Sequence, residues 1–305
     1  MYKAYMRILE EELLVAMGCT EPIALAYAAA KARDVLNARP DKVLLQVSGS
    51  IIKNAKSVVV PNTGHMKGIV ASVAAGIIAG KTEKKLEVLS EVSEKDICEI
   101  SKYIENTVIK FSHSEDGPVF EIIVNVFKDN DYAKVRISDH HTNITLIESN
   151  GETLYRSDDK AETKKITADR SLLSIENIWE FAMSVDTDDV KDILEKQIEY
   201  NCAIANEGLT GDYGANIGKV LINTYGENSV AVRAKAMAAA GSDARMSGCE
   251  MPVIINSGSG NQGIVCSVPV AEYAKELKSS PEQLLRALVI SNLTAIHAKT
   301  AIGIL

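Results

Sequence analysis

Apolar residues recur every three or four positions near both ends of the chain, which is the spacing of amphipathic helices. The pattern predicts a helix over residues 3–16, ended by Gly18, and a second helix from Thr20, where Glu21 and Pro22 suit a first turn. Further helices are predicted at 66–78, 175–183, 190–205, 215–225, 229–240 and 281–298. Most of the chain outside its middle is therefore expected to be helical.

Apolar and polar residues alternate in the middle of the chain, which is the pattern of half-buried strands. Strands are predicted at 41–48, 85–89, 107–112, 119–127, 132–138 and 142–148, with a charged helix at 94–105. The expected fold is α+β: a mainly helical catalytic domain, residues 1–84 and 166–305, carrying an inserted small antiparallel α+β domain, residues 85–165.

Four segments rich in glycine and polar residues interrupt the predicted helices: 48–54, 206–214, 243–249 and 256–263. In the last segment, three glycines in eight residues leave bare backbone, and donors and acceptors come from Ser257, Ser259, Asn261 and Gln262. One interpretation is a turn at a helix start whose backbone N–H groups bind a small anion. The alternative interpretation is a plain turn between helices. We expect segments 48–54 and 256–263 to form two walls of one pocket, which Cys19 faces.

Composition narrows the class of protein. The chain has 305 residues, 46% of them hydrophobic, which is ample for a globular core. A net charge of −8 and 5% aromatic residues argue against a nucleic-acid partner. The acidic run 10–12 breaks any apolar signal-peptide core, and the apolar stretch 69–79 is too short to span a membrane. A cytoplasmic location without membrane contact is therefore expected.

The cysteines and histidines divide into structural and chemical candidates. Cys98, Cys202 and Cys266 lie among apolar neighbours and are expected to be small core residues, without disulfides. The histidines of the middle segment, among them the adjacent pair 140–141, are expected on the surface. Cys19 differs, because it stands at the elbow where the second helix begins, and a helix N-terminus favours a thiolate.

Together, five segments resemble one family: 18–22 (Gly-Cys-Thr-Glu-Pro), 48–54, 207–214, 243–252 and 256–263. They are similar, in order and over nearly the whole chain, to the L-cysteine desulfidase family, relatives of the iron-sulfur L-serine dehydratase alpha chain. The resemblance implies elimination of hydrogen sulfide from L-cysteine, giving pyruvate and ammonia, with a [4Fe-4S] cluster as cofactor. It also implies a helical catalytic domain with an α+β insert.

The resemblance also assigns roles to residues. Cys19 resembles the family's proton acceptor; the alternative is a buried elbow cysteine. Substrate-binding residues are expected to be Thr20, Glu21, Lys53, Asn54, Ser257, Ser259, Asn261 and Gln262. Lys53 and Asn54 are candidates for binding the substrate carboxylate or orienting the leaving group, and the residues of 257–262 for cradling the carboxylate or the α-amino group. Arg245 and Glu207 are expected either to do the same or to pair with each other.

The chemistry needs a well-placed base and an activated leaving group, because the α-proton of an amino acid is a weak acid. A cluster iron with an open coordination position would activate the leaving group by acting as a Lewis acid. By resemblance, the cluster cysteines of the family lie beyond Leu305, so no metal ligand is predicted in this chain. The helix near 281–305 has no stop signal and is interpreted as truncated. We therefore expect self-association as a homo-oligomer or a need for a complementing C-terminal chain before activity is seen.

Two other functions remain open from the sequence. The same chemistry would accept a hydroxyl leaving group, which makes an L-serine dehydratase-like enzyme the first alternative. The second alternative is a non-catalytic remnant that binds an amino acid or a partner.

Overall fold

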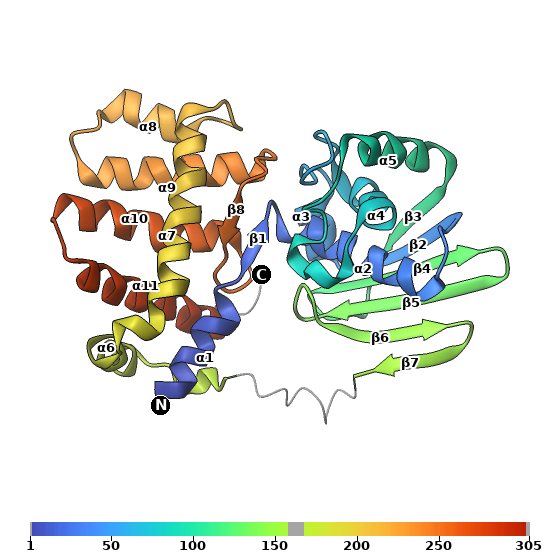
Figure 1. Ribbon diagram of the computed structural model, residues 1–305, viewed down its shortest axis with the longest axis horizontal. Helices are drawn as coiled ribbons and strands as arrows, with labels where there is room; N and C mark the ends of the chain where they lie inside the picture. Colours follow the sequence, from blue (N-terminus) through green and yellow to red (C-terminus); the bar gives the residue numbers. More distant parts are fainter. Residues whose placement is uncertain (1, 158–167, 303–305) are drawn as a thin grey trace. The chain divides into compact units, whose positions relative to one another are not determined.

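The structure is a computed structural model that describes residues 2–157 and 168–302 (Figure 1). Its contacts divide the chain into two compact units. The sheet unit is Met17–Lys165, and the helical unit combines Met1–Ala16 with Ile166–Leu305.

The sheet unit contains a six-stranded sheet with the order β3-β2-β4-β5-β6-β7. Its strands are β2 (Lys42–Val47), β3 (Val108–His113), β4 (Glu121–Lys128), β5 (Asp131–Ser138), β6 (Ile144–Ser149) and β7 (Glu152–Arg156). The pair β2–β3 is parallel and the other neighbouring pairs are antiparallel. The α+β class is confirmed, but the sheet is mixed rather than antiparallel, because β2 pairs with both β3 and β4.

Three rows of buried residues cross the centre of this sheet. The rows are Val47-Ile122-Ile137, Leu45-Val124-Val135 and Val43-Val126-Ala133. All nine side chains are at most 2% exposed. Side chains at alternate strand positions share one face, so this face is the core of the unit. Helix α2 (Thr20–Leu36) packs on it across β4 and β5 (Figure 1).

A second layer of helices lies on α2. The sheet unit's remaining helices are α3 (Gly49–Ala55), α4 (Gly68–Ala79), the 3-10 helix η1 (Thr82–Glu87) and α5 (Glu94–Asn106). A Cβ atom on Gly76 of α4 would come within 2.1 Å of the carbonyl oxygen of Ala26 on α2. Glycine at 76 and the alanine-rich face of α2 therefore let the two backbones approach closely.

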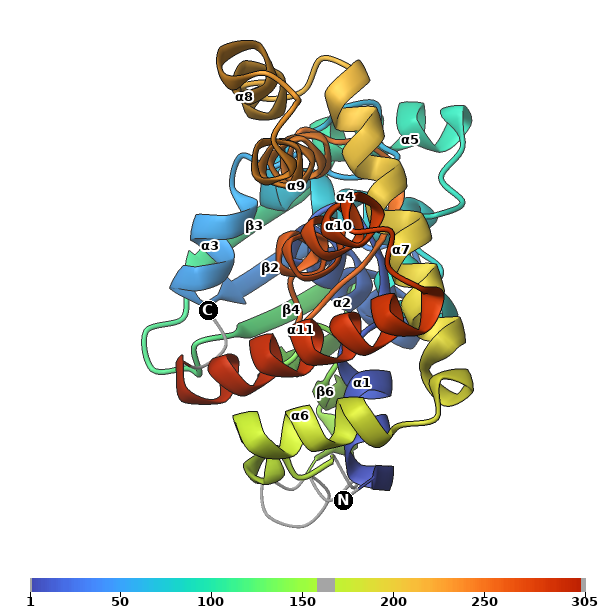
Figure 2. The same cartoon turned by 90° about the vertical axis from the view of Figure 1, so that its left-hand side faces the viewer.

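The helical unit is built from seven α-helices in its described residues. They are α1 (Tyr2–Glu12), α6 (Ile175–Ser184), α7 (Thr187–Thr210), α8 (Ile217–Tyr225), α9 (Val230–Met246), α10 (Gly260–Glu276) and α11 (Pro281–Ile302). A short 3-10 helix, η2 (Arg170–Leu172), precedes α6, and the strands β1 (Val15–Met17) and β8 (Pro252–Ile254) pair with each other. Helix α7 packs against α9, α10 and α11, and Figure 2 shows α11 between α6 and α10.

Several predicted elements differ from the structure. The first helix ends at Glu12 instead of 16, because the alternating residues that follow form β1. The predicted strand 85–89 lies in and just after η1, where Leu86 and Leu89 are buried without strand pairing. The predicted turn 48–54 is helix α3, since Gly49 and Ser50 occupy a helix start, where they cost little. The predicted turn 206–214 is shorter, because α7 continues to Thr210.

The two units also differ from the predicted domain ranges. Residues 17–84 belong to the sheet unit, since β2 lies inside the sheet and α2 covers its core face. The predicted inserted segment 85–165 therefore shares its core with the residues before it. The segment 158–167, around the second predicted boundary, and residues 303–305 of the apolar end lie outside the described residues.

Candidate active site

Cys19 is the residue before the first turn of α2. Its backbone is extended, with φ −79° and ψ 132°, and its side chain makes no capping hydrogen bond. Gly18 before it has φ +60°, a conformation that glycine adopts without strain, and a Cβ there would lie 2.2 Å from Cγ of Pro61. The chain thus turns sharply at Gly18 and places the Cys19 thiol, 3% exposed, at a helix N-terminus.

The carboxylate of Glu21 gathers three polar side chains of the sheet unit. Its Oε2 atom accepts from the thiol of Cys19 at 3.0 Å and from the hydroxyl of Thr20 at 3.3 Å. Its Oε1 atom accepts from the amide of Asn54 on α3 at 3.1 Å. The structure therefore brings together four residues that the sequence predicted as candidates.

The fifth candidate of this unit stands apart from the carboxylate. Lys53 precedes Asn54 on α3, and its side chain is exposed. Helix α3 has 3.6 residues per turn, so consecutive side chains point in different directions. The helix therefore directs Asn54 to Glu21 and Lys53 toward solvent.

The segment 256–262 of the helical unit forms a tight turn that leads into α10. Asn256 and Ser259 exchange backbone hydrogen bonds of 3.1 and 3.0 Å, and Ser259 caps α10 by accepting from the backbone of Gln262. The amide oxygen of Asn256 accepts from Ser257 at 2.9 Å and from Gln262 at 3.0 Å. Three predicted candidates, Ser257, Ser259 and Gln262, thus shape the turn itself.

Asn261, the fourth candidate in this turn, has a different partner. Its Oδ1 atom accepts from Nη1 of Arg245 on α9 at 3.0 Å. The Arg245 side chain is 4% exposed, and its Nε atom is buried without a hydrogen-bond partner. The proposed pairing of Arg245 with Glu207 is not among the ion pairs of the described residues; Glu207 instead accepts from the hydroxyl of Tyr213 at 2.9 Å.

A buried polar network supports the turn from below. The amide of Asn256 donates to Oδ1 of Asn292 at 2.9 Å, and Asn292 and Gln197 exchange two hydrogen bonds of 2.8 and 3.0 Å. Beside them, Asn201 bonds both the backbone N–H and the carbonyl of Ile254 in β8. The four amide side chains are fully buried. Such satisfied networks hold a loop in one conformation.

The sequence did not reveal this network. Gln197, Asn201 and Asn292 lie on helices that were predicted from apolar spacing alone, where polar residues are normally assigned to the solvated side. The sequence did contain a signal for buried polar side chains. Gln197 and Asn201 are four residues apart and lie on one helix face with Leu194 and Ile204.

The cysteines do not assemble a cluster site. All five are free, and no three Cys, His, Asp or Glu side chains in residues 2–157 and 168–302 are arranged to hold a metal ion. Burial raises the pKa of the thiols of Cys202 and Cys266 to about 11, so both are neutral. A [4Fe-4S] cluster needs several converging thiolates, and the described residues do not fit it. Cys98, predicted to be a core residue, is exposed on α5, whose buried side carries other residues.

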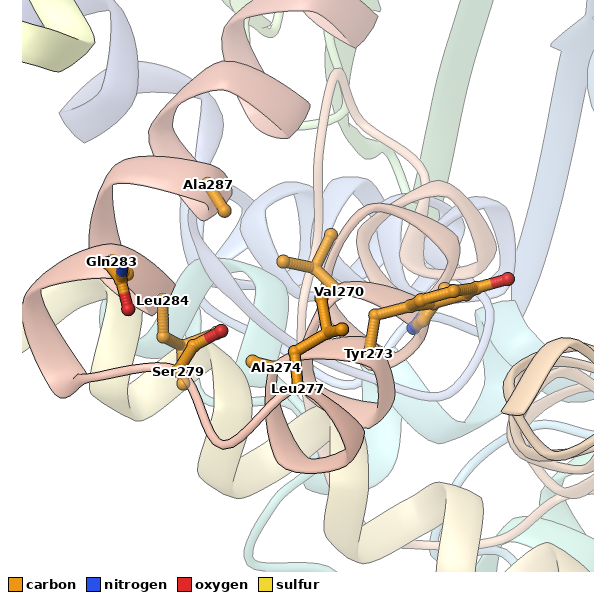
Figure 3. A pocket seen from close by; sticks show the side chains of 9 residues that line it. Val270, Tyr273, Ala274, Leu277, Ser279, Gln283, Leu284 and Ala287 are labelled. Carbon is orange, nitrogen blue, oxygen red and sulfur yellow. The ribbon is translucent and has the colours of Figure 1, made fainter. Parts of the chain in front are cut away.

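A separate hollow lies at the other end of α10 (Figure 3). It measures about 290 Å³ and is lined mainly by apolar side chains of α10 and α11, including Val270, Leu277 and Leu284. The amide of Gln283 at its rim is occupied in capping α11, where it accepts from the backbone of Ser280. Among the residues that the structure describes, no charged side chain lines the hollow, so it does not suit a polar amino acid.

Comparison with known proteins identifies the family. A family model described as the serine dehydratase alpha chain matches residues 83–305. A UPF0597 protein of Desulfitobacterium hafniense is 57% identical over 302 residues, covering 99% of this chain and 70% of the relative. UPF0597 proteins of Lachnoclostridium phytofermentans and Finegoldia magna are 48% and 45% identical over 303 residues, each covering 99% of this chain and 72% of the relative.

These matches place the chain among lyase-type enzymes. The chain belongs to the serine dehydratase alpha chain family. Within the part of the chain that the structure describes, none of the helices combines the length and the apolar character of a membrane span.

Proposed function

We propose that this protein is a lyase that eliminates hydrogen sulfide from L-cysteine, with Cys19 as the proton acceptor. The observation that carries the proposal is the hydrogen bond between the Cys19 thiol and Glu21 at the start of α2. A thiol is a useful base only as a thiolate, and two features favour proton transfer from it. The N-terminus of α2 stabilises negative charge on sulfur, and Glu21 provides an acceptor for the thiol proton.

The reaction begins when the Cys19 thiolate removes the α-proton of the substrate. The electrons of the Cα–H bond form a Cα=Cβ double bond, and the Cβ–S bond breaks. Sulfur leaves with the bonding electrons and takes a proton to become hydrogen sulfide. The other product, 2-aminoacrylate, tautomerises to an imine, and water hydrolyses the imine to pyruvate and ammonia. The proton that the leaving sulfide takes is the one that Glu21 accepted from the Cys19 thiol, so the reaction ends with Cys19 as a thiol and Glu21 as a carboxylate, as it began.

Thr20 and Asn54 position this pair. Together they occupy both oxygens of Glu21, so the carboxylate is oriented toward Cys19. We also propose Lys53 and the residues of the 257–262 turn as substrate-binding groups. Lys53 is the exposed cation nearest in sequence to Asn54, and its charge suits a substrate carboxylate.

L-serine is the second candidate substrate, because the family model that matches the chain is described as a serine dehydratase alpha chain. The motifs around Cys19 and in 256–263 favour L-cysteine by resemblance. The two substrates differ only in the leaving group, sulfide against hydroxide, so proton removal by Cys19 serves both.

The resemblance also implies a [4Fe-4S] cluster, and the described cysteines do not fit one. Ligands for a cluster would therefore have to come from residues outside those described or from a complementing chain. A homo-oligomer is the other assembly we propose to test. Five free thiols are typical of a reducing compartment, which supports a cytoplasmic location.

Pyruvate formation from L-cysteine and from L-serine tests the proposal. The full chain is combined with a complementing C-terminal chain that supplies cluster cysteines, reconstituted with iron and sulfide under anaerobic conditions, desalted, and given each amino acid in turn. We expect pyruvate from L-cysteine, accompanied by an equal amount of sulfide. Pyruvate from L-serine alone would assign the second candidate, and no pyruvate from either substrate would reject the lyase.

A further inference from the structure

Strand β3 forms one edge of the six-stranded sheet, and Figure 1 shows it next to β2, at the opposite edge from β7. Just after the strand, the backbone N–H of Ser114 donates to the carbonyl of Val47 in β2. Successive residues of a strand direct their backbone groups to opposite sides, so those of Ile109, Phe111 and His113 point away from β2. In the part of the chain that the structure describes, these outward groups form no hydrogen bond. The edge is therefore free to pair with a further strand.

The side chains of β3 are apolar for an exposed edge. Val108 is 49% exposed and Phe111 is 45% exposed. Lys110 is the single lysine, arginine or carboxylate residue among the six positions of the strand, and the pairing with β2 continues without a bulge. Proteins that stay monomeric protect their sheet edges with charges, prolines or bulges, because an unprotected edge pairs with other chains. Strand β3 has little of this protection.

The other edge of the same sheet is protected. Strand β7 has five residues and carries Glu152 and Arg156 at its two ends. Its register against β6 shifts between Ile147 and Glu148. Charges and a bulge both discourage the addition of a further strand. The contrast between the two edges points to β3 as the one that pairs.

We propose that β3 pairs in the antiparallel direction with β3 of a second copy of this chain, which joins two six-stranded sheets into one. A two-fold axis perpendicular to the sheet then relates the copies and keeps each face of the sheet on the same side. Near the middle of the strand, this symmetry places either Lys110 or Phe111 opposite its own copy. Like charges directly opposite each other destabilise a strand pair, so the register centred on Phe111 is favoured.

The register centred on Phe111 also suits the other residues of the strand. Lys110 then faces Ser112 of the second copy, and Ile109 faces His113. The backbone groups of Ile109, Phe111 and His113 all point outward, so these pairs exchange the hydrogen bonds that the free edge lacks. No two like charges meet in this arrangement.

Phe111 extends a row of the sheet core. It lies next to Leu45 of β2, which begins the buried row that continues through Val124 and Val135. In the dimer, the two Phe111 rings meet at the axis, and the two buried rows become continuous. An aromatic pair of this kind adds to the free energy of association, which favours a second copy over an unrelated strand.

The proposed dimer is independent of the lyase function. Its surface belongs to the sheet unit, whereas the sequence predicted self-association from the apolar end of the chain, at 281–305. Substitutions on β3 therefore test this surface separately.

Sedimentation equilibrium of the full chain measures the dimer. Phe111→Glu places two carboxylates opposite each other at the axis, and Phe111→Lys places two ammonium groups there. Each variant is expected to raise the dissociation constant of the dimer by about a hundredfold or more, because like charges brought together in an interface are costly. A one-to-one mixture of the two variants is expected to form a heterodimer, since a carboxylate then faces an ammonium group.

Leu154→Glu is the matched control, because Leu154 is an exposed apolar residue of the opposite edge strand, β7. This variant is expected to keep the wild-type dissociation constant. Both side chains are about half exposed, so Phe111→Glu and Leu154→Glu should keep the circular dichroism spectrum of the wild type. Recovery of the dimer in the mixture separates loss of the interface from misfolding.

Several results would overturn the proposal. They are a wild-type protein that stays monomeric at the highest concentration tested, a Phe111→Glu variant that dimerises like the wild type, and a mixture of the two variants that stays monomeric. Loss of the dimer in Leu154→Glu would place the contact at the other edge of the sheet and would also overturn it.

Discussion

The Sγ atom of Cys19 lies 3.0 Å from Oε2 of Glu21, so a thiol and a carboxylate share a hydrogen bond where α2 begins. The two residues are members of one predicted motif with only Thr20 between them. Their pairing depends on the turn at Gly18 and on Asn54, which holds the other oxygen of the carboxylate.

Glu21→Gln is expected to lower the rate of pyruvate formation by about 10²- to 10⁴-fold, because an amide cannot take the proton of the thiol. The fold should persist, since a glutamine oxygen can still accept from Asn54. Steady-state rates measure the effect. Glu94→Gln is the control, because Glu94 is also a first-turn acid, on α5, and is exposed. Equal rates for wild type and Glu21→Gln would remove Glu21 from the mechanism.

Gly18→Ala is expected to destabilise the protein more than Gly151→Ala. Both residues have positive φ, +60° and +86°, but a Cβ at 18 meets Pro61 and a Cβ at 151 meets no atom within 4 Å. Strain alone costs about 1–2 kcal/mol at either position, and the clash adds about 1–3 kcal/mol at Gly18. Urea unfolding measures both variants. Similar unfolding free energies for the two variants would show that Pro61 moves aside easily and does not hold the turn before Cys19 in place.

Asn292→Leu is expected to lower the free energy of unfolding by about 1–3 kcal/mol, because it leaves the buried amide of Gln197 without a partner and removes one hydrogen bond of Asn256. It should also raise the KM for L-cysteine by loosening the 256–262 turn, whose residues we propose to bind the substrate. Asn223→Leu, at an exposed position of α8, is the control and should change stability by less than about 0.5 kcal/mol. An Asn292→Leu variant as stable as the wild type would contradict the network.

The thiols are expected to differ in reactivity. Burial raises the pKa of Cys266 from 9.0 to about 11, so at pH 8 roughly one thiol in a thousand is ionised. Cys98 is exposed and should react with iodoacetamide first. Peptide mass analysis of a time course measures the order, with Cys98→Ser as the control. Labelling of Cys266 as fast as that of Cys98 would show that the buried thiol on α10 becomes exposed readily by local opening.

The same raised pKa values make stability depend on pH. Cys202 and Cys266 ionise near pH 9 in the unfolded chain and only near 11 when folded. Their contribution to folding stability is therefore complete below pH 9 and is lost as the pH rises from 9 to 11. The double variant with alanine at both positions should show a shallower loss in this range, measured by thermal unfolding.

The local pattern of apolar and polar residues predicted most helices and strands. It did not predict the pairing between strands that are far apart in the sequence. The helices at 94–105, 175–183 and 281–298 and five of the strands are confirmed within a few residues. The position of β2 between β3 and β4 was not predictable from spacing, because strand pairing across more than 60 residues leaves no periodic signal. The predicted inserted domain, residues 85–165, was therefore too short at its start.

The candidate site was predictable where residues lie close in sequence. Cys19, Thr20 and Glu21 belong to one motif, and the structure adds Asn54 to them. The partners of Arg245 were not predicted, because its neighbours Gly260 and Asn261 meet it only through the packing of α9 on α10. Similarly, the support from Gln197 and Asn292 depends on the packing of α7 against α11.

Cys19→Ser tests the central claim most directly. Serine is a favourable residue at a helix N-terminus, so the substitution should leave α2 and the melting temperature intact. The account predicts that pyruvate formation from L-cysteine falls by about a thousandfold or more, because a serine hydroxyl is a far weaker base than a thiolate at neutral pH. Cys98→Ser, in the same unit, should keep the wild-type rate. A Cys19→Ser variant that forms pyruvate at a rate close to that of the wild type would contradict the assignment of Cys19 as the proton acceptor.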